Sequence, residues 1–388
     1  MRKILVFILF FCFGANIFSQ DVKFSDSIDF DVLTVSPGSE LYSIFGHSAI
    51  RLIDHRKGYD FVFNYGTFDF QTEGFYFKFA LGRLDYRLSV ESFEDFMQMC
   101  EYENRTVLAQ KLNLSREQKH TLLFALIENY RPENRYYRYK FFTDNCATRI
   151  RDILSQHISG IRWDSLSKVG SGKTFRELYR PYLEQMPWTL TGIELLLGPM
   201  ADRPAGFDVM FLPDKLYQSL TLAKLGDKPL VNEEKVLFKA EPVPSRSARF
   251  NPLYLAIFLL IIALLVQISG TSKRIFDNIL FTTFGLLGAF ILSLSIASAH
   301  NELHYNAAVL LFCPFLVVWP WIYKPAYRLL ILYISLIFIV IALAVAPFIP
   351  QNFNITTYFI VAALVIRYVF NILEIRFGNL NLIHLIKK

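Results

Sequence analysis

Apolar positions divide the chain into two parts of different pattern. After Pro252, long apolar runs follow one another with short polar joints between them. Each run approaches or exceeds the roughly 17–25 residues that cross the core of a bilayer. The runs cover about 253–268, 279–297, 307–323, 329–349 and 355–373. The pattern therefore predicts an all-α bundle of five transmembrane helices within residues 250–388.

The charges in the joints predict how this bundle lies in the membrane. Basic residues follow the first, third and fifth runs, at Lys273, Arg274, Lys324, Arg328, Arg376, Lys387 and Lys388. The joints at 301–305 and 351–354 contain no Lys or Arg. Because basic joints stay in the cytoplasm, we expect a multi-pass inner-membrane protein with a cytoplasmic C-terminus. Arg367 interrupts the fifth run near its cytoplasmic end, where we expect its long side chain to snorkel to the interface.

The part before these runs has the pattern of an exported globular domain. Residues 1–20 combine a basic start with an apolar run of about ten residues, which is typical of a signal peptide. Residues 21–249 then have the composition of an ordinary globular domain, with turn sequences such as the one at 36–38. Two strand-like runs at 44–52 and 61–66 flank a turn, which predicts a β-hairpin. We expect this domain to lie in the periplasm.

Two helices are predicted in the same domain. The capping box Ser115–Gln118 begins the first, which ends before Pro132. The second begins within a residue or two of Cys146, since good N-cap residues precede it and apolar residues recur at helical spacing after it. Those apolar residues are Ile150, Ile153, Leu154 and Ile158. We therefore expect this domain to contain both strands and helices.

Composition excludes several classes of protein. Hydrophobic residues make up 53% of the chain and charged residues 19%, whereas soluble domains carry about 25% charged residues, so a wholly soluble protein is excluded. The net charge of +6 belongs largely to the loops of the membrane part, and we expect no nucleic-acid partner. Four cysteines are too few for a disulfide scaffold. No glycine loop of the phosphate-binding type follows a strand, and no cofactor is predicted.

Cys146 is the candidate nucleophile. Its place at the start of a helix puts the thiol near the positive end of the helix dipole, which lowers the pKa of a thiol. A low thiol pKa is what a nucleophilic cysteine requires. Two other interpretations stay open: a buried structural cysteine, and a disulfide with Cys100.

His47 is the candidate general base. It opens the first strand of the predicted hairpin, where it would face Asn64 or Tyr65 on the second strand. Either side chain could orient the imidazole as the third member of a triad. The alternative is a strand histidine that is simply hydrogen-bonded.

Further side chains are candidates for substrate binding. Asn145 and Arg149 flank the cysteine, and Arg138 belongs to a stretch of basic and aromatic residues that suits phospholipid headgroups. A solvated strand is the alternative for this stretch. In the membrane part, His300 and Glu302 lie in an outward loop, but Glu does not directly follow His300 as a zinc helix requires. We therefore predict no metal.

These residues resemble those of the Lnb lipoprotein N-acyltransferase family. The resemblance rests on the segments 46–49, 64–70, 144–146, 201–203 and 211–213, and His300, Asn306 and Pro314 are similar to the family's second outward loop and following helix. It covers nearly the whole mature chain. The family is similar to circularly permuted papain-like (NlpC-type) enzymes and to lecithin:retinol acyltransferase-like enzymes, in which the histidine also precedes the cysteine.

The resemblance implies an α+β papain-like domain and a membrane acyltransferase. Cys146 would take an acyl chain from a membrane phospholipid as a thioester, His47 would act as the base, and the N-terminal amine of a lipoprotein would receive the chain. His300, Glu302 and Asn306 would lie at the outer interface. Two alternatives stay open: an exported papain-like cysteine peptidase or amidase acting on cell-wall peptides, and a transporter or sensor without catalysis.

Overall fold

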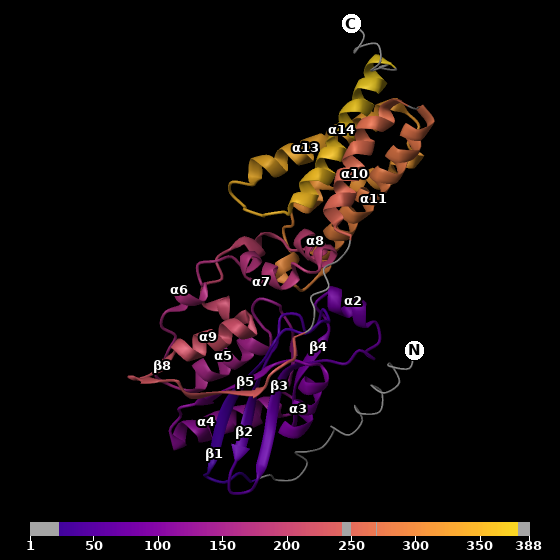
Figure 1. Ribbon diagram of the computed structural model, residues 1–388. Coiled ribbons are helices and arrows are strands. Elements are labelled where there is room, and N and C mark those ends of the chain that lie inside the picture. The colour runs from indigo at the N-terminus through magenta and orange to yellow at the C-terminus, as the bar shows by residue number, and fades with distance from the viewer. Residues whose placement is uncertain (1–22, 243–249, 269, 379–388) are drawn as a thin grey trace. The chain divides into compact units, whose positions relative to one another are not determined.

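The computed structural model describes residues 23–242, 250–268 and 270–378 (Figure 1). The predicted signal peptide at 1–20, and Lys387 and Lys388, lie outside the described residues. The chain forms two compact units, each described by itself below. The first holds the described residues up to Lys173 and those from Pro204 to 242. The second holds Thr174–Arg203 and the described residues from 250 onward.

An antiparallel sheet of seven strands is the centre of the first unit. Its order is β10-β5-β1-β2-β3-β4-β6, so β6 is an edge strand. The strands are β1 (Ile28–Val35), β2 (His47–Asp54), β3 (Tyr59–Thr67), β4 (Asp85–Ser92), β5 (Val107–Leu112), β6 (Tyr136–Arg138) and β10 (Val231–Phe238). The pairing of β2 with β3 confirms the predicted hairpin. A small second sheet contains β7 (Ile161–Arg162), β8 (Lys224–Leu225) and β9 (Lys228–Pro229).

Helices cover both faces of this sheet, because its strands alternate apolar side chains on either face. Helix α3 (Phe93–Tyr102) packs Phe96 and Cys100 against Leu33, Ala49 and Val62. On the other face lie α4 (Arg116–Tyr130), α5 (Cys146–His157) and α9 (Pro213–Leu222). Both predicted helices are thus confirmed, α4 with its capping box. The remaining helices are α2 (Phe75–Ala80), α6 (Leu166–Val169) and η2 (Gly206–Phe211).

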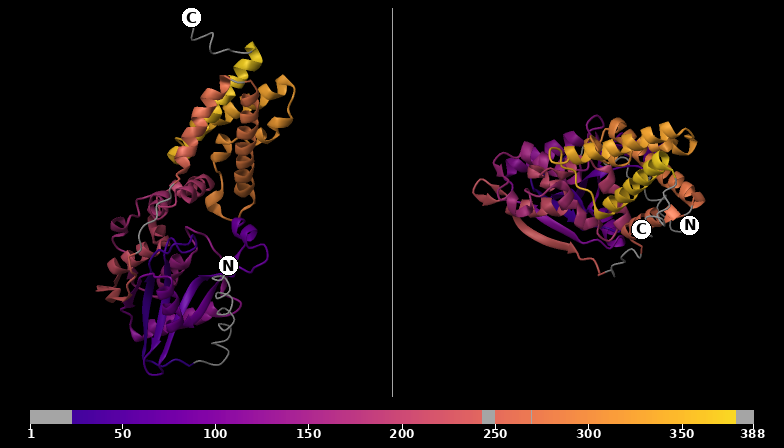
Figure 2. Two further views of the ribbon diagram at one scale, coloured as in Figure 1. Left: turned by 45° about the vertical axis from the view of Figure 1, so that its right-hand side comes forward. Right: turned by 90° about the horizontal axis from the view of Figure 1, so that it is seen from above.

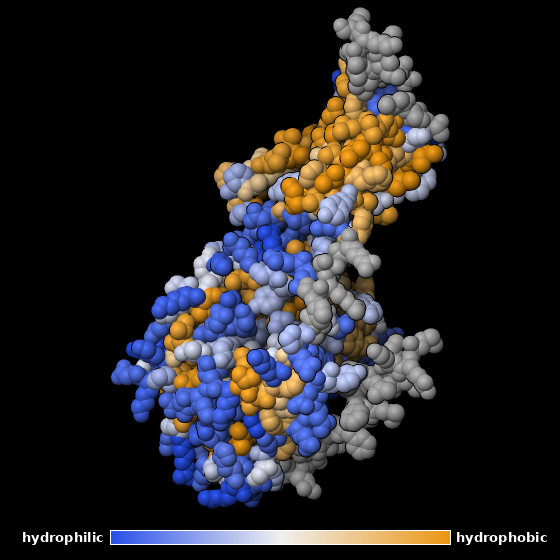
Figure 3. Space-filling model, in the orientation of Figure 1, coloured by the Kyte–Doolittle hydropathy of each residue, from blue (hydrophilic) through white to orange (hydrophobic). Residues whose placement is uncertain are grey.

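Apolar helices form most of the second unit, and apolar side chains cover their outer surfaces (Figure 3). Among the described residues, three helices are long and apolar enough to cross a membrane: α11 (Gly270–Ala297), α13 (Pro325–Val345) and α14 (Ile355–Phe377). The first predicted run forms the shorter α10 (Pro252–Leu265), which continues into η3 (Val266–Ile268). The third forms a pair of helices bent by 44°, with α12 (Ala308–Leu311) in one arm and η5 (Pro314–Trp321) as the other.

Close packing joins these helices. A Cβ added to Gly285 of α11 would lie 2.5 Å from the backbone nitrogen of Val317, and one added to Gly288 would lie 1.6 Å from the carbonyl oxygen of Phe312. Small residues are what allow helix backbones to approach this closely in a membrane. Helix α10 runs along α14 (Figure 2).

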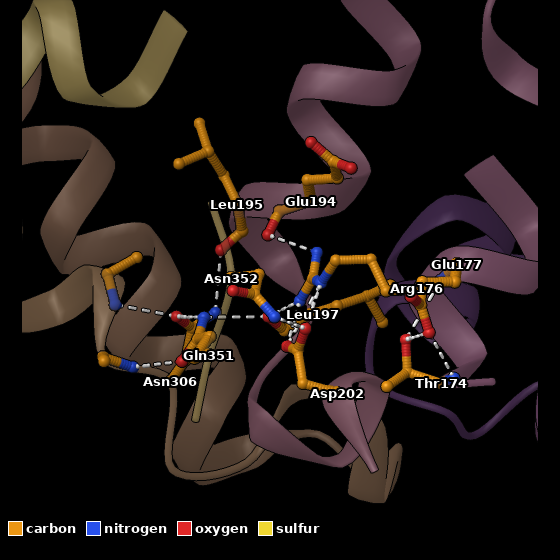
Figure 4. Close-up of polar contacts among 12 residues, drawn as sticks. Thr174, Arg176, Glu177, Glu194, Leu195, Leu197, Asp202, Asn306, Gln351 and Asn352 are labelled. Atoms are coloured by element: carbon orange, nitrogen blue, oxygen red, sulfur yellow. Dashed lines mark hydrogen bonds and ion pairs between the residues drawn. The ribbon is translucent and has the colours of Figure 1, made fainter. Parts of the chain in front are cut away.

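The segment Thr174–Arg203, which precedes the predicted membrane runs, packs with the helices of the second unit. It contains α7 (Phe175–Leu183), α8 (Pro187–Leu196) and η1 (Pro199–Asp202). Arg176 donates to Asp202 from two of its three guanidinium nitrogens, Nε and Nη2, at 3.0 Å each. Figure 4 shows the pair. Asn352, in the joint before α14, donates to the same carboxylate at 2.8 Å. A buried ion pair thus ties α7 and η1 to a joint of the membrane part.

We expected the Arg367 side chain to snorkel to the interface, and this expectation is wrong. Its side chain is 0% exposed and forms two hydrogen bonds with Asp277 of α11, at 2.6 and 2.8 Å. Gln267 and Asn371 complete the cluster. The physical reason is that a carboxylate on a neighbouring helix neutralises the guanidinium inside the bundle, so the side chain has no need to reach water.

Candidate active site

Asn145 sets the first residue of α5. Its side-chain oxygen accepts hydrogen bonds from the backbone N–H groups of Ala147 and Thr148 at 2.9 Å each, and the Thr148 hydroxyl accepts one from the Asn145 N–H at 2.7 Å. The Asn145 amide group donates to the carbonyls of Phe141 and Phe211, at 2.8 Å each. All its polar atoms are therefore used to fix the start of the helix, and Asn145 positions Cys146.

Burial controls the chemistry of the Cys146 thiol, whose residue is 8% exposed. Burial raises the pKa of this thiol, and the N–H groups of Ser48, Ala147 and Cys146 itself offset only part of the effect. The helix end therefore does not give the lowered pKa that the sequence suggested, because loss of water outweighs the dipole. Cys100, Cys146 and Cys313 are free thiols, so Cys146 forms no disulfide with Cys100.

His47 is held by a chain of hydrogen bonds across three strands. Its Nε2 lies 2.5 Å from Oδ1 of Asn64, and Nδ2 of Asn64 donates to Glu91 at 2.9 Å. Because the Asn64 nitrogen is used by Glu91, its oxygen faces the ring and Nε2 carries the proton. Desolvation lowers the pKa of His47 to about 4, although the bond with Asn64 acts in the opposite direction. The imidazole is therefore neutral near pH 7.

The thiol and the imidazole belong to elements that begin close together. β2 begins at His47 and α5 begins at Cys146, and the N–H group of Ser48 lies within hydrogen-bonding reach of the thiol. The charge of Arg105 acts on the pKa of both groups. His47 pairs with Val35 in the sheet and so shares the face that carries α3. The candidate site lies at this end of the strands.

Tyr65 lies on the opposite face of β3 from Asn64, and the structure pairs His47 with Asn64 alone. Tyr65 is buried and borders a cavity of about 380 Å³. The cavity is otherwise lined by polar and charged side chains together with Ile153: Asn129, Lys140, Thr143, Asp144, Arg149, Asp152, Gln156 and His157. Arg149 is held at its edge by two bonds to Asp144, at 2.5 and 2.9 Å.

Tyr137 is a site residue that the sequence analysis did not single out. It lies on the edge strand β6, its ring is 4.0 Å from the guanidinium of Arg149, and it is 8% exposed. Its hydroxyl is buried and has no hydrogen-bond partner among the described residues. The stretch between the two helices contains three tyrosines, and no local signal distinguishes the one that points inward.

Two further candidates, Arg138 and Asn306, differ in how firmly hydrogen bonds and ion pairs hold their side chains. Arg138, beside Tyr137, is half exposed and pairs with Asp85 at 3.0 Å. In the second unit, Asn306 donates to the carbonyls of Leu195 and Leu196 and accepts from Gln351 (Figure 4). Its side chain therefore holds α8 against the membrane part.

The loop before α12 in the second unit contains a buried acid. Glu302 lies in η4 (Asn301–Leu303), is 2% exposed, and neither carboxylate oxygen has a hydrogen-bond partner among the described residues. His304 bonds the carbonyl of Ser298 at 2.8 Å, and the backbone N–H of His300 bonds the hydroxyl of Ser298. Within the described part of the chain, no group of three or more His, Cys, Asp or Glu side chains could hold a metal ion.

Fold and site together define a membrane protein with a mixed α and β domain, in which a buried cysteine begins a helix and a hydrogen-bonded histidine begins a strand. Residues 23–181 match the family described as the Lnb N-terminal periplasmic domain, and residues 244–376 match the Lnb transmembrane domain. The chain therefore belongs to the Lnb family, and the resemblance seen in its sequence is confirmed. No curated protein and no solved structure is significantly similar to it.

Membership of the family has consequences for location and class. The protein is a membrane protein whose N-terminal part is periplasmic. Its family suggests an enzyme of lipoprotein modification.

Proposed function

We propose that the protein is an acyltransferase that moves a fatty acyl chain from a membrane phospholipid, through a thioester on Cys146, to the N-terminal amine of lipoproteins. The observation that carries the proposal is the buried thiol at the start of α5, close to the start of the strand that bears a neutral, hydrogen-bonded histidine. The periplasmic domain would be a circularly permuted papain-like domain of the NlpC type, in which the histidine precedes the cysteine.

The first half-reaction uses a neutral pair of groups. Since the pKa of the thiol is raised and that of His47 is lowered to about 4, the resting site holds a thiol and an imidazole. His47 takes the thiol proton as the sulfur attacks the ester carbonyl, which is general-base catalysis. The C–O bond to glycerol then breaks, and the imidazolium returns the proton to the leaving alkoxide. The products are the acyl-thioester and a lysophospholipid.

The second half-reaction delivers the chain to an amine. The unprotonated amine of the acceptor attacks the thioester carbonyl, the C–S bond breaks, and the amine proton returns to the thiolate through His47. A thioester is a good donor to an amine, so one nucleophile divides a difficult transfer into two easier steps. Asn64 would keep Nε2 protonated throughout and so hold the ring in the required tautomer.

An apolar surface on the periplasmic unit supports a lipid substrate. Aromatic rings extend from Tyr137 through Tyr86 and Phe68 to α2. Helix α2 buries none of its side chains, and its Tyr76 and Phe77 are 82% and 71% exposed. Exposed apolar patches of this kind mark surfaces that meet membranes, ligands or other proteins.

The proposed substrate-binding residues differ in whether their polar atoms already have hydrogen-bond or ion-pair partners within the protein. Arg138 and Arg149 already pair with carboxylates, but cations beside the site suit a lipid phosphate. Asn145 and Asn306 would act by positioning, since their side chains are fully hydrogen-bonded. His300 and Glu302 remain proposed contacts, and the unpaired carboxylate of Glu302 suits an ammonium group.

The test is acyl transfer by the purified full chain in lipid nanodiscs. Phosphatidylethanolamine with deuterated acyl chains and a diacylglyceryl-cysteine lipopeptide are supplied, and mass spectrometry follows the peptide. We expect an N-acylated, deuterated product with wild-type protein and with the control Cys100→Ala. Burial raises the pKa of the Cys100 thiol to about 12, so this cysteine is not expected to act as a nucleophile. Cys146→Ala should abolish the product. Retained transfer by Cys146→Ala would refute the mechanism.

Two other results would contradict the proposed acyl transfer or its proposed donor. Release of peptides from isolated cell wall, without N-acylation, would favour the exported cysteine peptidase or amidase. An acyl chain without deuterium would show that the donor is the lipopeptide's own glyceride and would refute the phospholipid donor. The same proposal includes an inner-membrane location with a cytoplasmic C-terminus, which a C-terminal reporter active only in the cytoplasm tests directly.

A further inference from the structure

The buried hydroxyl of Tyr137 forms no hydrogen bond with any described residue, the sulfur of Cys146 included. Burial of a hydroxyl that makes no hydrogen bond destabilises the folded protein. The ring has other contacts that hold it, since Arg149 stacks on it and Tyr65 meets it edge-on at 6.5 Å. The phenol is therefore held rigidly with an unused donor.

Bare backbone at Gly66 leaves a space that this donor and Cys146 share. A Cβ built on Gly66 would lie 3.8 Å from Cβ of Cys146 and 3.9 Å from the hydroxyl oxygen of Tyr137. Gly66 has a φ of +93°, a conformation that L side chains rarely adopt, so the space is kept open by the backbone itself. The cysteine and the phenol thus border one small gap.

The geometry points to Tyr137 as the oxyanion donor of this site: its O–H would donate a hydrogen bond to the carbonyl oxygen of the acyl group that Cys146 attacks. This inference rests on the proposed acyl transfer and adds a catalytic residue to it. As the S–C bond forms, the carbonyl π pair moves to oxygen, and the resulting anion accepts the phenol proton in a hydrogen bond. When the C–O bond breaks, the pair returns and the phenol keeps its proton.

The surroundings keep the phenol a donor. Burial raises the pKa of Tyr137 well above its usual value, the Cys146 thiol acts in the same direction, and the Arg149 cation only partly opposes them. The group therefore stays protonated across the working pH range. A fixed donor in a water-poor site is worth more than the same donor in water, and removing one such donor commonly lowers rates by about 100- to 1000-fold.

Two reactions of the same sulfur separate this role from a structural one. Acylation by p-nitrophenyl hexanoate passes through a tetrahedral oxyanion, whereas alkylation by iodoacetamide displaces iodide and forms none. With the full chain in nanodiscs, Tyr137→Phe should lower the acylation rate of Cys146 about 100-fold and leave its alkylation rate unchanged. The control is Tyr217→Phe, which removes a tyrosine hydroxyl of α9 that bonds Glu234 and should change neither rate.

Each remaining outcome decides between the two proposals. Equal acylation by Tyr137→Phe and wild type would overturn the oxyanion role alone. A parallel loss of both reactions would also overturn it, because it would show that the hydroxyl only shapes the site. If wild-type Cys146 is alkylated but never acylated, the acyl-transfer proposal itself falls. Intact-protein mass spectrometry distinguishes these cases.

Discussion

At the scale of single residues, the site depends on which charges water no longer stabilises. Burial raises the pKa of the Cys146 thiol and lowers that of the His47 imidazole, so each group is pushed toward its neutral form. This differs from a resting thiolate–imidazolium pair, in which both groups are charged. The proton must therefore move during the attack, and His47 is required as a base at that moment.

The pH dependence of acylation follows from this neutral pair. A base with a pKa of about 4 is protonated below that pH and free above it. We expect the acylation rate of Cys146 to fall as the pH drops through about 4, and to stay level from there to neutral pH. Stopped-flow kinetics in buffers of constant ionic strength measures this acylation rate at each pH. Because a proton moves during the attack, the reaction should also be slower in heavy water. A rate that declines as the pH rises from 6 to 8 would instead require an imidazolium.

At the scale of elements, the cap of α5 couples helix stability to the position of the nucleophile. The cap was predictable because Asn145 precedes an amphipathic helix, a local pattern. That its amide would also bond the carbonyl of Phe211 was not, since that residue lies 66 positions further along the chain. Likewise, hairpin pairing was predictable for His47, but only the register of β2 against β3 decided that Asn64 rather than Tyr65 meets the ring.

Removal of this cap should affect both stability and reactivity. Asn145→Ala loses an N-cap, worth about 0.5–2 kcal/mol, and removes the hydrogen bonds from its amide to the carbonyls of Phe141 and Phe211. We expect a lower Tm and slower alkylation of Cys146 by iodoacetamide. Ser115→Ala is the matched control. It removes the N-cap of α4, where the Ser115 hydroxyl accepts a hydrogen bond from the backbone N–H of Gln118. It should lower Tm without changing the alkylation rate, and equal alkylation in both variants would contradict the positioning role.

At the scale of the whole molecule, buried ion pairs organise the second unit. Arg176 with Asp202 joins α7 to η1, and Arg367 with Asp277 joins α14 to α11. Sequence showed the charges but not their partners, because the two members of the second pair are 90 residues apart. The same limit applies to Asp202, whose further partner Asn352 lies 150 positions along the chain.

The pair inside the bundle gives a prediction about stability. Removing one member leaves the other as an unpaired buried charge, which costs about 3–5 kcal/mol. Arg367→Leu alone and Asp277→Leu alone should each lower the thermal stability of the chain in nanodiscs. The double variant should recover much of the loss, since no charge is then stranded. Additive losses in this double-mutant cycle would show that the two side chains do not interact.

The sequence alone determined the division of the chain into an exported part and a run of apolar helices, the hairpin that bears His47 and the helix that begins at Cys146. These follow from hydrophobic period and capping chemistry, which act over a few residues. Tertiary structure decided the partner of His47, the direction in which the pKa of the thiol moves, the unused hydroxyl of Tyr137 and the burial of Arg367. Each depends on how much water distant segments exclude, and no local pattern encodes that exclusion.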